Sequence, residues 1–122
     1  MSLDLTLLPF DSDKGIHFSH TVLSLLTNVH DLFDDIKKID AETGKKVPED
    51  FSSYVSRDDD YEDTHYGKTL ITPYGNPVHY ILVKDLLELS LHPKVIAYKK
   101  HNAIWAYLSQ LEPETKVALF WH

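Results

Sequence analysis

Four histidines, His17, His20, His65 and His79, could supply proton transfer or metal binding, which are the usual functions of imidazole near neutral pH. His17 and His20 are three residues apart, so a strand would turn them to opposite faces and they would not bind one ion together. No HExxH motif and no Cys/His ribbon accompanies them. The four remain candidates for a metal or a His/Asp site assembled from distant segments, a possibility that spacing alone leaves open.

An acidic run in the middle of the chain carries the highest density of charge. Its acidic residues are Asp58, Asp59, Asp60, Glu62 and Asp63. Carboxylates bind Ca²⁺ and Mg²⁺, but an EF-hand loop beginning at Asp58 would need glycine and glutamate where this chain has Asp63 and Thr69. Because the acids repel one another, we expect an exposed segment that faces a partner, or one that surrounds a cation.

Two familiar catalytic patterns are absent from the sequence. Gly67-Lys68-Thr69 resembles the end of a phosphate-binding loop, but such a loop needs a glycine five positions earlier, and that position is Glu62. The chain has no GxSxG motif and no cysteine nucleophile. These absences favour a protein that is not an enzyme, and we expect no cofactor.

Tyrosines accompany the acidic run. Tyr61 lies within it, and Tyr66 and Tyr74 follow it. Tyrosine supplies contact area at a low entropic cost, so these side chains predict a binding surface that includes the acidic residues. The alternative is that the tyrosines cover the edge of the hydrophobic core.

The composition limits the class of partner. The chain has 122 residues, 43% of them hydrophobic, no cysteine and a formal charge of −7. Residues 1–63 contain 15 acids and 6 bases, which gives −9, whereas residues 64–122 carry +2. Binding of nucleic acid through phosphate contacts is therefore disfavoured, while a basic protein partner or a divalent cation is permitted. An acidic mimic of DNA and a simple solubilising surface are alternatives.

No secretory signal and no apolar run of the roughly 20 residues needed to span a bilayer is visible. We therefore expect a cytoplasmic protein that does not enter the membrane. The absence of cysteine agrees with a reducing compartment without proving it.

The elements that position these residues indicate a single α+β domain over residues 1–122. Its expected fold is a mainly antiparallel sheet of four to five strands with two to three helices packed on one face. Alternating or apolar runs predict strands over residues 3–7, 18–26, 70–72, 78–83 and 117–121. Pro9 either ends the first strand or marks a sheet edge, and the leucine-rich end of residues 18–26 could instead be helical. Apolar spacing predicts helices over residues 29–39, 85–91 and 93–111, the last broken at 99–101 with a new start at Asn102. Residues 44–69 are expected to form a long loop.

Several segments together resemble a family of small uncharacterised phage and prophage proteins. They are residues 3–11 (LDLTLLPFD), 66–69 (YGKT), 73–75 (PYG), 106–108 (AYL) and 116–122 (KVALFWH). The resemblance spans most of the chain. It implies a phage-encoded protein acting in the host cytoplasm or carried in the particle, and it transfers no catalytic residue, because the family has no assigned activity.

The sequence thus predicts a non-enzymatic interaction protein. Residues 44–69, with their acids and tyrosines, and Tyr74 after them would bind a host or phage protein. A small enzyme or ligand-binding domain with a His/Asp site is the principal alternative. A homodimer is left open.

Overall fold

The computed structural model describes residues 3–13, 16–19, 21–27, 29–53 and 67–122 of the chain. These residues form an α+β fold, as the sequence predicts. The strands are β1 (Leu5–Asp13), β2 (Ile16–Ser19), β3 (Leu23–Ser24), β4 (Lys45–Lys46), β5 (Ser52–Ser53), β6 (Gly67–Lys68), β7 (His79–Leu82) and β8 (Lys116–Trp121). The helices are α1 (His30–Thr43), α2 (Val83–Leu87), α3 (Pro93–Ile96) and α4 (Lys99–Ser109).

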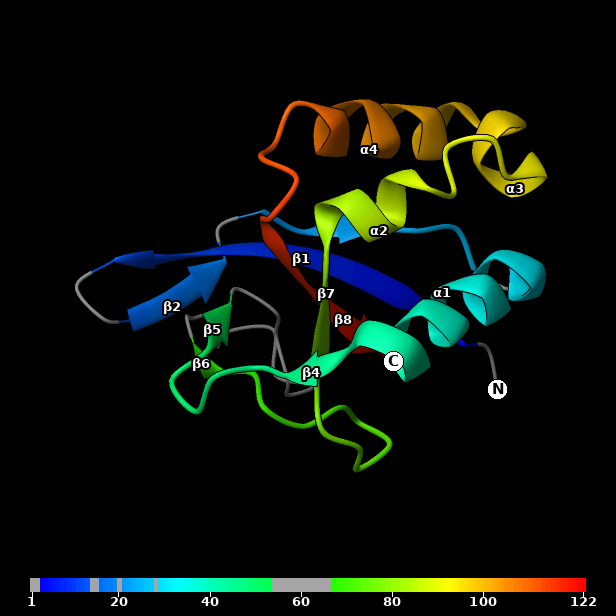
Figure 1. The fold of residues 1–122 in the computed structure, drawn as a ribbon. Coiled ribbons are helices and arrows are strands. Elements are labelled where there is room, and N and C mark those ends of the chain that lie inside the picture. Colours follow the sequence, from blue (N-terminus) through cyan, green and yellow to red (C-terminus); the bar gives the residue numbers. More distant parts are fainter. Residues whose placement is uncertain (1–2, 14–15, 20, 28, 54–66) are drawn as a thin grey trace, which may run out of the picture.

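The strands follow the order β4-β7-β8-β1-β2-β5-β6, and β3 pairs with β1 beside this path. Figure 1 shows β1 as a long curved strand with β8 and β7 beside it. Every pairing is antiparallel except that of β2 with β5, which is parallel. The sheet is therefore mixed and has more strands than predicted, because several two-residue strands extend it.

One face of the sheet packs against all four helices. Helix α1 buries Leu32, Phe33 and Ile36 there, which confirms the apolar spacing seen in the sequence. Leu5 of β1 and Leu119 of β8 meet them from the sheet. Each such side chain contributes about 1.5–3 kcal/mol by its burial, so this face holds most of the apolar core.

The opposite face carries a smaller cluster that contains no helical residue among those described. Phe10 of β1 packs on Phe51 with ring centroids 4.7 Å apart, and Tyr80 of β7 meets Phe10 edge to face. Val47 joins them, so two apolar residues of the predicted loop 44–69 anchor it to the sheet. Figure 1 shows β4, β5 and β6 on the side of the sheet away from α2, α3 and α4.

The first strand is longer than predicted, and Pro9 does not end it. Asp4 and His122 form a hydrogen-bonded pair, in which each backbone N–H donates to the carbonyl of the other residue. Hydrogen-bonded pairs alternate along an antiparallel ladder, so Leu8 and Phe10 bond to β8 and Pro9, between them, does not. Proline lacks an N–H group, and this register requires none on that side.

Four other predictions of secondary structure were wrong. The strand predicted over residues 18–26 is divided into β2 and β3. Residues 70–72 form no strand, and a single isolated bridge joins Ile71 to Pro77, just before β7. Helix α4 begins at Lys99, so the break falls between α3 and α4, before the Lys99-Lys100-His101 run. Residues 44–69 were predicted as a loop but contain the short strands β4, β5 and β6.

Candidate functional site

The predicted partner-binding segment joins two paired strands. The chain leaves β5 after Ser53 and re-enters the described structure in β6 at Gly67, and these two residues are partners in the sheet. The acidic residues 58–63, with Tyr61 and Tyr66, lie outside the described residues, as do His20 and His65. Tyr74 is described, and 42% of it is exposed on the turn that precedes β7.

Buried hydroxyl groups hold the two strands at the ends of this segment. Ser53 and Thr69 are fully buried, and their side-chain oxygens lie 2.7 Å apart. The Thr69 backbone N–H donates to the Phe51 carbonyl at 2.9 Å. In β2, the strand paired with β5, the Ser19 hydroxyl donates to the Pro9 carbonyl at 2.6 Å. Buried hydroxyl groups paired in this way fix the geometry from which the segment departs.

Replacing Thr69 with valine is expected to lower the free energy of unfolding by about 1–2 kcal/mol, because the Ser53 hydroxyl loses its buried partner while the side-chain shape is kept. Urea unfolding followed by circular dichroism measures the change. Thr43→Val is the matched control, since Thr43 is exposed on α1 and should change stability by less than about 0.5 kcal/mol. Equal effects of the two substitutions would contradict the anchoring role of Thr69.

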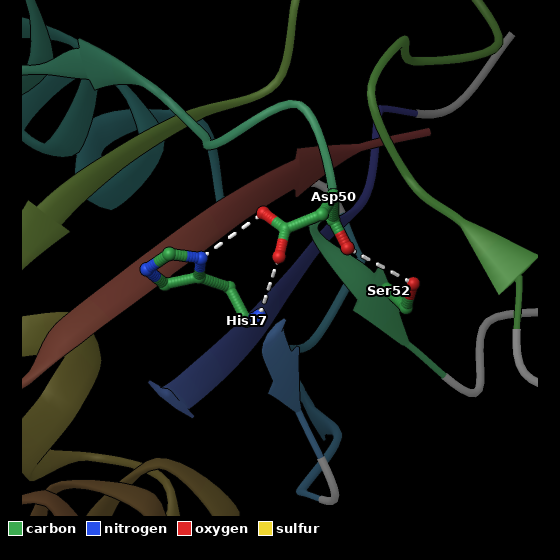
Figure 2. Close-up of polar contacts among 3 residues, drawn as sticks. All are labelled: His17, Asp50 and Ser52. Atoms are coloured by element: carbon green, nitrogen blue, oxygen red, sulfur yellow. Dashed lines mark hydrogen bonds and ion pairs between the residues drawn. The ribbon is translucent and has the colours of Figure 1, made fainter. Parts of the chain in front are cut away.

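His17 is held by Asp50 in a two-point contact, which Figure 2 shows. The Asp50 carboxylate accepts the His17 imidazole Nδ1–H at 3.0 Å and the His17 backbone N–H at 3.0 Å. The side chains are 26% and 38% exposed, respectively. Because Nδ1 donates to the carboxylate, Nε2 is the nitrogen left to accept a proton or bind a ligand.

Ser52 does not complete a catalytic triad with this pair. Its hydroxyl donates to the Asp50 backbone carbonyl at 3.2 Å, on the side of Asp50 away from the imidazole (Figure 2). A triad needs the hydroxyl at the other imidazole nitrogen. His17 instead borders a hollow whose lining includes Glu114 and Lys116.

The hydrogen bond from the His17 side chain, followed by that from the His17 backbone, lowers the pKa of Asp50 below its ordinary range. A carboxyl group with a lowered pKa stabilises the fold above the pKa it has when unfolded, and this contribution is lost as the pH falls through the lowered value. His17→Ala should therefore raise the pKa of Asp50, as measured by NMR titration of its carboxyl carbon. His79→Ala is the control and should leave it unchanged; a rise in both variants would contradict the assignment.

His79 forms a second pair of the same kind, with Asp40 of α1. The distance from His79 Nδ1 to Asp40 Oδ1 is 3.0 Å, and the side chains are 36% and 22% exposed, respectively. The pair borders a hollow of about 390 Å³, which we call the His79 hollow. Lys37 and Asp40 of α1, His79 of β7, Trp121 of β8 and the turn at Tyr74 contribute to its lining.

Gly44, just after α1, allows this pairing. A Cβ atom at Gly44 would overlap the Asp40 carboxylate and would lie 2.5 Å from the Asp40 backbone oxygen. The Gly44 backbone N–H donates to that same oxygen at 2.8 Å. The φ angle of Gly44 is −68°, so close approach rather than a left-handed backbone requires glycine.

His17 and His79 do not form one site. They border different hollows, and each binds its own aspartate. Across residues 3–13, 16–19, 21–27, 29–53 and 67–122, no three His, Asp or Glu side chains are grouped so that they could hold a metal ion. The structure therefore brings His17 and His79 each to a carboxylate from a distant segment, at two separate places.

Two further histidines have structural roles that the sequence analysis missed. His92 caps α3, because its Nδ1 accepts the Lys94 backbone N–H at 3.0 Å, and its Nε2 lies 3.1 Å from Asp35. His101 is fully buried in α4. The position of His92 directly before Pro93 is a helix-start signal that could have revealed the cap.

The chain matches no protein-family model, no curated protein and no solved structure. The resemblance to phage and prophage proteins thus stays a prediction from the segments quoted above. None of the helices in the described part of the chain is long and apolar enough to cross a membrane.

Proposed function

We propose that this chain is a non-enzymatic, phage-type interaction protein that binds a host or phage protein through residues 44–69 and the adjoining Tyr74. The observation that carries the proposal is the pairing of Ser53 with Gly67, because it ties both ends of the acidic segment to one edge of the sheet. A segment held at both ends loses less conformational entropy on binding than one held at a single end.

The charge and side-chain chemistry support a basic partner. Asp58, Asp59, Asp60, Glu62 and Asp63 supply negative charge, which would accelerate association with a basic surface and select against acidic ones. Tyr61, Tyr66 and Tyr74 supply aromatic contact area of the kind enriched at binding surfaces. The buried hydroxyl pair Ser53 and Thr69 holds together the two chain ends between which residues 54–66 run.

The test is affinity capture from host lysate followed by a binding measurement with the purified partner. A variant in which the five acidic residues 58–63 are changed to Asn or Gln should bind at least about tenfold more weakly, and the difference should shrink at high salt. The matched control removes five charges elsewhere. Its substitutions are Asp34→Asn, Glu42→Gln, Glu88→Gln, Glu112→Gln and Glu114→Gln, all at exposed positions outside residues 44–69.

Equal binding by the two variants would contradict the proposal, as would the absence of any stoichiometric partner. An acidic mimic of DNA is distinguished in the same experiment. In that case the captured partner would be a DNA-binding protein, and double-stranded DNA would displace this chain from it.

A further inference from the structure

Both apolar and polar residues line the His79 hollow. Leu3, Pro77 and Trp121 are apolar, and Lys37 and His79, with the Asp40 carboxylate that holds the imidazole, supply polar groups. Its volume of about 390 Å³ lies within the range of sites that bind small organic molecules. Such sites combine apolar contact with a few polar groups that fix orientation.

The Asp40 contact sets the orientation of His79. The carboxylate of Asp40 only accepts hydrogen bonds, so the His79 nitrogen 3.0 Å from it, Nδ1, carries the proton. In the neutral imidazole, Nε2 then presents a lone pair on the side of the ring away from Asp40. The imidazole can therefore accept a hydrogen bond from an N–H or O–H group of a molecule in the hollow.

Two lysines, Lys37 and Lys46, place positive charge near His79. The Lys37 ammonium lies 5.2 Å from the centre of the Trp121 ring, and Lys37 forms no ion pair with any described residue. Lys46 of β4 is exposed and is the cross-strand partner of His79. Side chains of directly paired strand residues point to the same face, so Lys46 adds to the positive potential beside His79.

We propose that the His79 hollow binds a small ring-containing organic acid. Its ring lies against Trp121 and Pro77, its carboxylate or phosphate group pairs with Lys37, and an N–H or O–H group donates to His79 Nε2. This site uses none of the acidic residues 58–63, but it shares Tyr74 with the partner-binding surface proposed above. Lys37 and His79 lie outside that surface, so variants of these two residues test the hollow separately.

The probes are two acids, each with an uncharged counterpart. 4-Hydroxyphenylacetate is compared with 4-hydroxyphenylacetamide, and adenosine monophosphate is compared with adenosine. The readout is the indole N–H signal of Trp121 in a proton–nitrogen NMR spectrum of the full chain. The chain contains a second tryptophan, Trp105, which is an internal reference because its N–H donates to the buried Leu86 carbonyl at 2.8 Å.

At least one acid should shift the Trp121 signal at millimolar concentration, leave the Trp105 signal in place and bind about tenfold more tightly than its uncharged counterpart. The acid with the larger difference identifies the anion as a carboxylate or a phosphate. Equal binding of acid and counterpart overturns the proposal, and so does the absence of a Trp121 shift with both acids at about 10 mM.

Two pairs of variants separate the site from its surroundings. Lys37→Met should weaken acid binding about tenfold, whereas Lys38→Met, at the next exposed position of α1, should not. His79→Asn keeps an amide donor for Asp40 but removes Nε2, so it should also weaken binding, while His17→Asn at the other His–Asp pair should have no effect. Acid binding that survives both Lys37→Met and His79→Asn overturns the proposal.

Discussion

Replacing His101 with leucine is expected to lower the free energy of unfolding by about 3 kcal/mol, because two backbone groups lose their partner in a fully buried imidazole. The His101 Nε2 atom accepts the Leu26 backbone N–H at 2.9 Å, and its Nδ1–H donates to the Lys94 carbonyl at 2.7 Å. The side chain is fully buried and thus joins α4 to the segment before α1 and to α3. Urea unfolding measures the loss.

The control is His30→Leu, since His30 is exposed at the start of α1 and should change stability by less than about 0.5 kcal/mol. Comparable losses in the two variants would contradict the role given to His101. The comparison also separates the buried imidazole from the general effect of removing a histidine.

His101 also predicts a dependence of stability on pH. Burial lowers the pKa of His101, an effect partly opposed by the hydrogen bond to the Lys94 carbonyl. The unfolded chain therefore takes up a proton at a higher pH than the fold does, so stability falls as the pH drops below about 6.5. In His101→Leu this part of the pH dependence should disappear, whereas an unchanged slope between about pH 6.5 and 5 would show that other groups cause it.

Replacing Gly44 with alanine is expected to lower the free energy of unfolding by about 2–3 kcal/mol. The new methyl group would meet the Asp40 backbone oxygen, which cannot rotate away, and would displace the carboxylate that holds His79. The histidine signals of His79 in a proton–nitrogen NMR spectrum should then change along with stability.

Gly75→Ala is the matched control, because a Cβ atom there would meet nothing within 4 Å and the only penalty comes from its φ angle of 85°. We expect a loss of about 1 kcal/mol and an intact His79–Asp40 hydrogen bond. A larger loss at Gly75 than at Gly44 would show that backbone conformation, not close approach, dominates the glycine requirement.

Elements with a strong periodic pattern were predictable from the sequence. The spacing of Leu32, Phe33 and Ile36 predicted α1, and the apolar end of the chain predicted β8, which lies inside the sheet as expected. Each of these signals is local, so a short window of sequence contains it.

Features that depend on distant segments were not predictable. The strands β4, β5 and β6 have two residues each, too few for an alternating pattern to appear. The partners His17 and Asp50 are 33 residues apart, and His79 and Asp40 are 39 apart, so spacing could not pair them. The Lys99-Lys100-His101 run was interpreted as a helix break because it is polar. The partners that let the His101 imidazole be buried, Leu26 and Lys94, lie outside this run.

Hydrogen–deuterium exchange of the chain, with and without its captured partner, tests the proposed recognition role most directly. Binding through the acidic segment predicts slower exchange in residues 54–66 and in the turn around Tyr74, with α3 and α4 unchanged. Protection confined to α3 and α4, with exchange in residues 54–66 the same in the free and bound chain, would contradict it.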